Sequence, residues 1–233
     1  MKTYEDTTII IPTLNEEKNI GKLIAILERM YKGVYIIVAD DGSKDKTQQI
    51  VNQIHKKNSH VLLMNRKSEP VKGLTASVVD GFLWSNTKYS VVIDADLQHP
   101  PDKIALIVEK LRSGYDLVTG HRAKICIDWP WYRRVITKTG LAAGKLRLLI
   151  KGAISKDILS GYFGMQTKLV QKIIRERKDK FEMEGYKVLF DILKGLNKKT
   201  KIYDFPFSFD VRKEGHSKLT NKVMMTYLKS IFK

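Results

Sequence analysis

Short apolar runs alternate along the first half of the chain with longer segments in which apolar residues recur every three or four positions. The short runs are nearly continuous, which is typical of strands covered on both faces in a parallel sheet. They predict strands over residues 7–11, 34–40, 60–65, 89–94 and 115–120. The longer segments have the period of amphipathic helices. They predict helices over residues 15–30, within 41–57, and over 73–86 and 101–114.

The first predicted helix has both an apolar face and a helix-start signal. Asn15 is a good N-cap residue, and Glu16 and Glu17 follow it directly. Acidic side chains in a first turn interact favourably with the helix dipole. The sequence therefore predicts that this helix begins at Asn15.

The regular alternation ends near Gly120. Beyond it the pattern predicts a helix, a strand, two helices, a strand and a terminal helix, over residues 130–152, 160–166, 168–177, 184–196, 199–209 and 218–233. Repeated strand–helix units wind into a largely parallel, right-handed sheet. The predicted fold is therefore α/β and Rossmann-like, with helices flanking a twisted sheet. A chain of 233 residues fits a single domain, 1–233.

Charge and cysteine content restrict the function further. The formal net charge is +17, and the lysines and arginines gather in residues 124–233. Such a surface attracts nucleotides, phosphates, anionic lipids or nucleic acid. The single cysteine, Cys126, excludes an internal disulfide and fits a reducing compartment. Because no apolar run approaches the length of a spanning helix or a signal peptide, we expect a chain that is neither secreted nor transmembrane.

Two aspartates end the predicted strand at residues 89–94. Asp94 and Asp96, with Gln98 two positions on, offer hard oxygen ligands suited to Mg²⁺ or Mn²⁺. Ligands of open α/β sheets bind beyond the carboxyl ends of the strands, where these side chains fall. The alternative is a carboxylate pair that caps the next helix. A buried strand that delivers two charges to one edge favours the metal site. His99 fits a turn better than a ligand.

Three other strand ends carry polar residues. The loop at residues 12–19 offers backbone amides to a ligand, or simply caps a helix. Asp40 or Asp41 could accept hydrogen bonds from a base or a ribose, or form an Asx turn. Lys72 and Gly73 precede a helix N-terminus that could lie against a phosphate, the alternative being a solvated loop lysine.

These stretches occur together in one known order. The sequences PTLNEEKN, DDGSKDKT, KGLTASVVDGF and DADLQHPPD resemble those of family 2 glycosyltransferases, which have the nucleotide-sugar-binding GT-A fold. The later segments GHR, WYRRVIT, DILSGYFGMQ, EGYKVLFDIL and FPFSFDVRKEGHSKL are similar to the dolichyl-phosphate mannose synthase branch. The resemblance implies a single GT-A catalytic domain, with a donor half at residues 1–120 and an acceptor half at 121–233.

The resemblance assigns roles to particular residues. The positions expected to bind the nucleotide sugar are Pro12, Asn15, Glu16, Asp41, Lys72, Asp94, Arg212 and Lys218. The positions expected to hold Mg²⁺ or Mn²⁺ are Asp94, Asp96 and Gln98. The acceptor phosphate is expected at Arg122, Arg133 and Thr137. Catalysis is expected to depend on Asp96, Arg122 and Arg133.

The implied reaction is transfer of a hexose, with inversion, from a nucleotide sugar to a polyprenyl monophosphate. The first choice of donor is GDP-mannose. The alternatives are UDP-glucose or another UDP-sugar, or a saccharide hydroxyl as acceptor. The chain has no QxxRW element, which hydroxyl-glycosylating members of the superfamily use beside their base. The branch commonly has serine at the position of Thr137 and glutamate at that of Asp191, so the donor stays open.

Two segments predict contact with a membrane surface. Residues 129–150 and 218–233 combine aromatic and aliphatic residues with lysine and arginine, as interfacial helices do. The alternative is that each packs on the sheet. We expect a peripheral protein on the cytoplasmic face of a membrane. Small membrane proteins are possible partners, and binding of nucleic acid is not expected. A silent nucleotide-binding scaffold is disfavoured by the intact Asp94, Asp96 and Gln98 set.

Overall fold

The computed structural model describes residues 2–123, 144, 148, 155–208 and 230. The strands are β1 Thr7–Thr13, β2 Tyr35–Asp40, β3 Val61–Asn65, β4 Tyr89–Val92, β5 Leu117–Arg122, β6 Phe163–Gln166 and β7 Ile202–Phe207. The helices are α1 Ile20–Met30, α2 Thr47–His55, α3 Leu74–Trp84, α4 Ile104–Arg112, α6 Thr167–Arg177 and α7 Val188–Leu193, with short 3₁₀ turns at Pro101–Lys103 and Lys178–Lys180.

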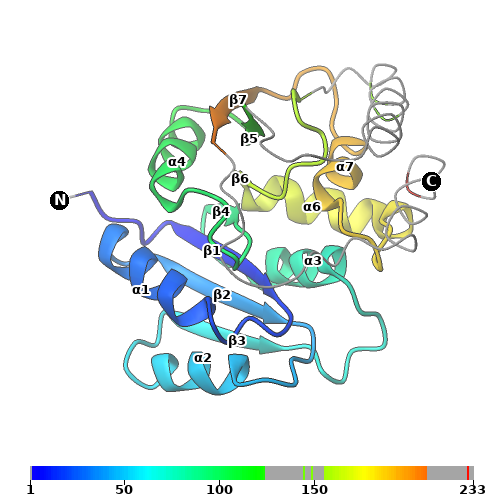
Figure 1. Cartoon of the computed structure of the whole chain (residues 1–233). Coiled ribbons are helices and arrows are strands. Elements are labelled where there is room, and N and C mark those ends of the chain that lie inside the picture. The colour runs from blue at the N-terminus through cyan, green and yellow to red at the C-terminus, as the bar shows by residue number, and fades with distance from the viewer. Residues whose placement is uncertain (1, 124–143, 145–147, 149–154, 209–229, 231–233) are drawn as a thin grey trace.

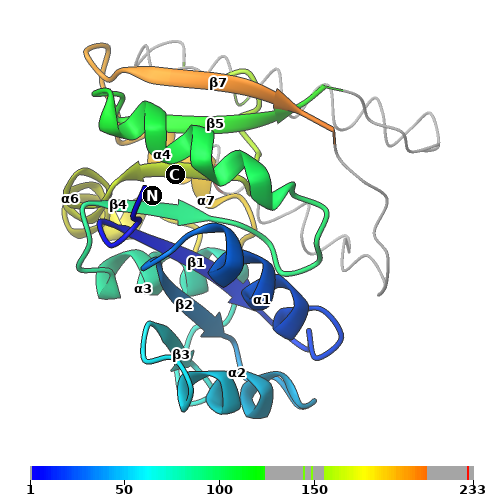
Figure 2. The same ribbon diagram turned by 90° about the vertical axis from the view of Figure 1, so that its left-hand side faces the viewer.

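The seven strands form one sheet in the order β3-β2-β1-β4-β6-β5-β7 (Figure 2). Strands β1 to β4 pair in parallel, and β5 pairs in parallel with β7. Strand β6 lies antiparallel between β4 and β5. The prediction of a mostly parallel sheet is confirmed. The strand order reverses at β1, which has β2 on one side and β4 on the other, and such a switch point is where α/β proteins bind ligands.

Helices cover both faces of the sheet (Figures 1 and 2). Apolar residues of α1, α2 and α4 form one core with Ile9 and Ile11 of β1, and those of α3, α6 and α7 form a second core with Ile10. Alternate residues of a strand point to opposite faces, so one continuous isoleucine run serves both cores. This burial explains why the strands carry so few polar residues.

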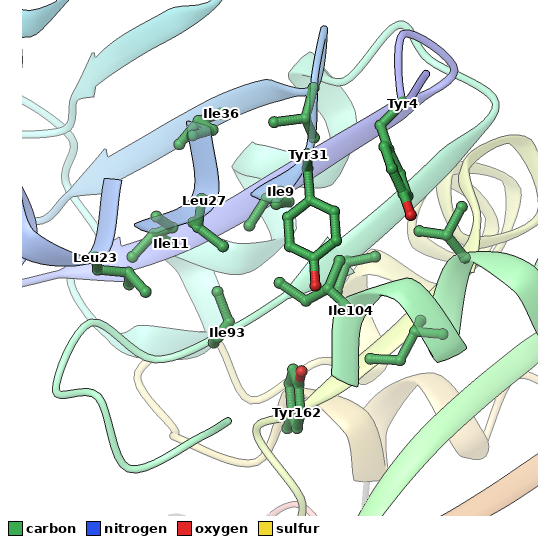
Figure 3. Packing of buried hydrophobic residues seen from close by; sticks show 14 of the residues in the cluster. Tyr4, Ile9, Ile11, Leu23, Leu27, Tyr31, Ile36, Ile93, Ile104 and Tyr162 are labelled. Atoms are coloured by element: carbon green, nitrogen blue, oxygen red, sulfur yellow. The ribbon is translucent and has the colours of Figure 1, made fainter. Parts of the chain in front are cut away.

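Two tyrosines of the first core fix the turn that follows β4. The Tyr31 hydroxyl donates to the carbonyl oxygen of Pro101 at 2.6 Å, and the Tyr162 hydroxyl donates to that of Pro100 at 2.8 Å. Both rings lie among aliphatic side chains of the core (Figure 3). Burial raises the pKa of both phenols, so the two groups remain neutral donors. The chain beyond Asp94 and Asp96 is thereby fastened to the core.

The predicted start of the first helix is wrong. Helix α1 begins at Ile20, and Asn15 has a positive φ of 55°. The backbone amides of Asn15, Glu16 and Glu17 donate instead to side chains of the loop at residues 43–47. These partners lie about thirty residues further along the chain, so local propensity could not reveal them.

None of the helices in the described part of the chain has both the length and the apolar character that crossing a bilayer requires. The amphipathic segments predicted over 129–150 and 218–233 lie outside the described residues, apart from single positions within them.

Candidate active site

The candidate site lies at the carboxyl ends of β1, β2 and β4, beside the switch point of the sheet. Thr13 pairs with Asp40 at the ends of β1 and β2. The amide of Ile93 still donates to the carbonyl oxygen of Ile10, at 3.2 Å, before the chain leaves β4. Asp94 is therefore the first residue beyond the sheet on that strand. The topology brings together strand ends that are far apart in the sequence.

Asp94 and Asp96 have different environments. The Asp94 side chain is 34% exposed, whereas the whole of Asp96 is 7% exposed. The Asp96 Oδ1 atom accepts a hydrogen bond from the amide of Gln98 at 3.1 Å, and Leu97 between them has a positive φ of 61°. A tight turn therefore holds the second carboxylate close to the chain that carries it, while the first remains accessible.

His99 supports this turn from beneath. The Asp94 amide donates to its Nδ1 atom at 3.3 Å. The imidazole stacks on the Tyr162 ring with centroids 5.0 Å apart, and the Phe207 ring meets it edge-on at 5.5 Å. Burial lowers the pKa of His99 to about 4, although the nearby Asp96 charge opposes this shift. His99 is thus a neutral packing residue near pH 7, in agreement with the interpretation of this position as a turn.

The buried His99 predicts an acid-sensitive fold. Its pKa rises from about 4 in the folded chain to about 6.5 on unfolding, so the unfolded state binds the extra proton between these values. Stability is present above pH 6.5 and is lost as the pH falls toward 4. In EDTA, the wild type should lose about 1.5 kcal/mol more than His99→Gln between pH 6.5 and pH 5. Urea unfolding at both pH values measures this, and parallel losses in the two proteins would refute it.

A loop of the second half of the chain packs directly against Asp94. A Cβ atom on Gly161 would lie 3.1 Å from Asp94 Oδ2, which is closer than ordinary contact. The loop of residues 157–161 starts at Asp157, whose Oδ2 atom accepts from Arg122 Nε at 3.1 Å. Arg122 ends strand β5. One loop therefore contacts both Arg122, from the predicted acceptor half, and Asp94, from the predicted donor half.

The loops after β1 and β2 brace each other. The Asn15 amide donates to Ser43 Oγ at 2.8 Å, and the Lys44 amide donates back to Asn15 Oδ1 at 2.8 Å. The Glu16 amide donates to Thr47 Oγ1 at 2.8 Å. Pro12 lies just before this brace, in β1. The predicted nucleotide residues of the two loops thus share one rigid edge.

Asp40 and Asp41 have different hydrogen-bond partners and different structural roles. Asp40 is fully buried and accepts from Thr13 Oγ1 at 3.0 Å and from the amides of Gly42 and Ser43. It therefore shapes the turn. The Asp41 carboxylate is paired with Arg66 and accepts the Gly73 amide at 2.7 Å. Burial raises the pKa of Asp41, and these two partners oppose the rise.

Of the two alternatives for the helix N-terminus after Gly73, the structure does not favour a phosphate site at the first amides of α3. The amides of Thr75 and Ala76 donate to the carbonyl oxygens of Gly185 and Met183, at 3.0 and 3.1 Å. Gly73 has a φ of 147°, and a Cβ atom there would lie 2.7 Å from the Met183 oxygen. The first amides of α3 are thus taken by another segment of the chain. The Lys72 ammonium contacts the carbonyl oxygen of Arg66.

The residues present fit a divalent cation in part. Asp94 and Asp96 supply hard oxygen ligands at one strand end, and Asp94 is accessible. Within the described residues, no group of three His, Cys, Asp or Glu side chains converges on one point. A cation here would take its remaining ligands from Gln98, water and substrate phosphates, which is usual for Mg²⁺.

Several predicted site residues lie outside the described residues and stay predictions. They are Arg133, Thr137, Arg212 and Lys218. Sequence reasoning also overlooked three residues of this region, Arg66, Asp157 and Lys187. Asp157 lies in the motif DILSGYFGMQ and Lys187 in EGYKVLFDIL, whereas Arg66 lies in none of the family motifs. Nothing in the local pattern distinguished these three residues from ordinary surface charges.

The family assignment follows from comparison with known proteins. The model of the family described as "Glycosyl transferase family 2" matches residues 8–174. A dolichol-phosphate mannosyltransferase of Pyrococcus furiosus is 34% identical over 97% of this chain and 62% of the relative. One from Saccharomyces cerevisiae is 32% identical over 96% of this chain and 85% of the relative. The chain thus spans just under two thirds of the length of the Pyrococcus relative.

A solved structure agrees with the fold. Glucosyl-3-phosphoglycerate synthase from Mycobacterium tuberculosis, in complex with Mn²⁺, UDP and glucosyl-3-phosphoglycerate, superposes with a TM-score of 0.68. It is 20% identical and covers 97% of this chain and 77% of the other. The predicted GT-A-like fold is confirmed. The chain belongs to glycosyl transferase family 2, and it is a glycosyltransferase. Within the family it belongs to the branch of the dolichol-phosphate mannosyltransferases.

Proposed function

We propose that this chain transfers mannose from GDP-mannose to the phosphate of a polyprenyl monophosphate, with inversion at the anomeric carbon. The observation that carries the proposal is the contact between the two halves of the chain. Gly161 packs on Asp94, and Asp157 of the same loop holds Arg122 at 3.1 Å. The same loop therefore contacts a cation suited to an acceptor phosphate and a carboxylate suited to a metal-bound diphosphate. Two relatives named dolichol-phosphate mannosyltransferase support the same reaction.

Arg122 orients the nucleophile in this proposal. Its guanidinium binds a phosphate well because its N–H groups match the phosphate oxygens. Asp157 accepts from Nε and so fixes the plane of the guanidinium. A phosphate monoester is ionised near neutral pH and attacks without a general base. The reaction then needs positioned cations more than a proton acceptor. Arg133 and Thr137 are proposed to share the acceptor phosphate, as the family resemblance implies.

The donor is proposed to lie across the ends of β1, β2 and β4. Pro12, Asn15, Glu16 and Asp41 line the nucleotide side, together with the predicted Lys72, Arg212 and Lys218. Asp94, Asp96 and Gln98 are proposed to hold Mg²⁺ or Mn²⁺, the cations named in structures of the Mycobacterium tuberculosis neighbour. A bound cation would stabilise the negative charge that develops on the departing nucleoside diphosphate.

We propose that the chain works as a peripheral protein on the cytoplasmic face of a membrane. A polyprenyl substrate resides in the bilayer, and the net charge of +17 favours contact with anionic headgroups. Small membrane proteins are the partners that this arrangement allows for. Nucleic acid is not among them, because a basic surface alone gives no role to the paired carboxylates.

A labelling experiment tests the reaction. The purified chain is incubated with Mn²⁺ or Mg²⁺, a polyprenyl monophosphate in detergent, and radiolabelled GDP-mannose or UDP-glucose, and the lipid is then extracted. Label from GDP-mannose in the lipid is the expected result. Label from UDP-glucose alone would replace the donor and keep the acceptor. Nucleotide binding without any lipid label would overturn the phosphate acceptor and favour a saccharide hydroxyl.

A further inference from the structure

A partly buried lysine near the site, Lys187, differs from the well-buried Lys194. Lys194 is 4% exposed, and its ammonium has three polar partners. It pairs with Asp191 at 2.8 Å and donates to the carbonyl oxygens of Lys180 and Ser230. This lysine has a structural role. Lys187 lies seven residues earlier, just before α7, and is partly buried.

Lys187 has few polar partners among the described residues. Within the described part of the chain its ammonium donates one hydrogen bond, to the carbonyl oxygen of Leu159 at 3.1 Å, and lies 4.3 Å from the centre of the Tyr186 ring. No carboxylate of the described residues lies within ion-pair distance of it. An ammonium has three N–H donors. A partly buried cation without a carboxylate partner is unfavourable unless an anion completes its surroundings.

The charged groups around Lys187 indicate where an anion would bind. Burial and the neighbouring Arg122 cation lower the pKa of Lys187 to about 8, while Asp157 and Asp94 oppose this shift. The ammonium therefore lies within electrostatic range of the Arg122–Asp157 pair and of the first carboxylate of the proposed metal site. Asp157 is already paired with Arg122. If a divalent cation neutralises Asp94, Lys187 and Arg122 leave an excess of positive charge at this place.

We propose that Lys187 binds the acceptor phosphate together with Arg122. The inference rests on the proposed function and adds a residue to its acceptor side. The Leu159 carbonyl holds the ammonium at the loop of residues 157–161, on the side of β5 and β6 and away from the nucleotide loops after β1 and β2. A phosphate there accepts hydrogen bonds from Lys187 and Arg122 and offsets the positive charge that Asp157 leaves uncompensated.

Three substitutions of Lys187 distinguish the effect of its charge from that of its hydrogen bond to Leu159. Lys187→Met removes the donor and the charge, Lys187→Gln keeps an amide donor for the Leu159 carbonyl without charge, and Lys187→Arg keeps the charge. Lys110→Met is the matched control. Lys110 is also partly buried and lies 4.9 Å from the centre of an aromatic ring, that of Tyr203, near the opposite ends of the strands.

The readouts are the KM values for a short-chain polyprenyl monophosphate and for GDP-mannose, with thermal stability. Loss of a charge-assisted hydrogen bond should raise the KM for the lipid phosphate about tenfold or more in Lys187→Met and Lys187→Gln. The KM for the donor should stay within about twofold, and Lys187→Arg and Lys110→Met should stay near wild type. Unchanged lipid KM in Lys187→Gln, or a change confined to the donor KM, would overturn the inference.

Equilibrium binding of the same lipid phosphate, by calorimetry, separates this inference from the proposed function. Weaker binding to Lys187→Met than to wild type supports the inference even if no sugar is transferred. Equal binding to both proteins refutes it even if the wild type is active. Failure of the wild type to transfer sugar would count against the proposed function alone.

Discussion

Replacing Asp96 by asparagine should lower the rate of sugar transfer at least a hundredfold. The substitution preserves the shape of the side chain, and an amide oxygen can still accept from the Gln98 amide at 3.1 Å. It removes one of two carboxylates that lie together beyond β4. A group that stabilises developing charge on a leaving group typically contributes about 10² to 10³ in kcat. Initial rates at saturating donor, lipid and Mn²⁺ measure the loss.

The control for Asp96→Asn is Asp102→Asn. Asp102 lies six residues further on, and its side chain is 59% exposed with Lys103 as its ion-pair partner at 3.5 Å. Its substitution changes the net charge equally but should leave the rate within about twofold, as is usual for exposed positions. If Asp96→Asn retained more than a tenth of the wild-type rate with an unchanged melting temperature, Asp96 would have no role in holding a metal ion.

Replacing Arg66 by methionine should lower the free energy of unfolding by about 3 to 5 kcal/mol. The Arg66 side chain is 3% exposed, and it pairs with Asp41 and, at 2.8 Å, with Asp80. It also donates to Ser77 Oγ at 3.1 Å and to the carbonyl oxygen of Val71 at 3.0 Å. Methionine fills much of the volume but leaves the buried Asp41 carboxylate without its cation. Urea unfolding at pH 7 measures the change.

Lysine should not rescue position 66. A single ammonium cannot reach the acceptors that the planar guanidinium contacts on several sides. Arg112→Met provides the comparison, because Arg112 also pairs with an aspartate, Asp6, at 2.7 Å but at the surface. That variant should lose less than about 1 kcal/mol. Similar losses in the two variants would show that the Arg66 network does not stabilise the nucleotide side of the site.

Much of the fold follows from local pattern. The five continuous apolar runs of the first half became strands because both faces of the sheet are covered by helices. The position of Asp94 and Asp96 beyond β4 was predictable for the same reason, since a strand that is buried on both faces excludes charge until it ends. The strand at residues 163–166 was also predictable, but its antiparallel insertion between β4 and β5 depends on distant pairing.

Local pattern was misleading, or left alternatives open, where distant segments compete for backbone groups. Asn15 has the character of an N-cap, yet Ser43 and Lys44 bond its backbone and side chain and hold it outside the helix. The amides at the start of α3 suit a phosphate, yet the carbonyl oxygens of Met183 and Gly185 occupy them. Lys187 was overlooked for a related reason. Its relation to Leu159, Arg122 and Asp94 exists only after the second half of the chain folds onto the first.

The stereochemistry of the product tests the central claim most directly. Purified chain, GDP-α-mannose, Mn²⁺ and a short-chain polyprenyl monophosphate are reacted to completion, and the anomeric configuration of the lipid product is determined by NMR. A single displacement by the phosphate oxygen predicts one product, a β-linked mannosyl phosphate. An α-linked product, or mannose attached to a hydroxyl group, would contradict the account, because the arrangement of Arg122, Asp94 and Asp96 supports direct attack by a phosphate.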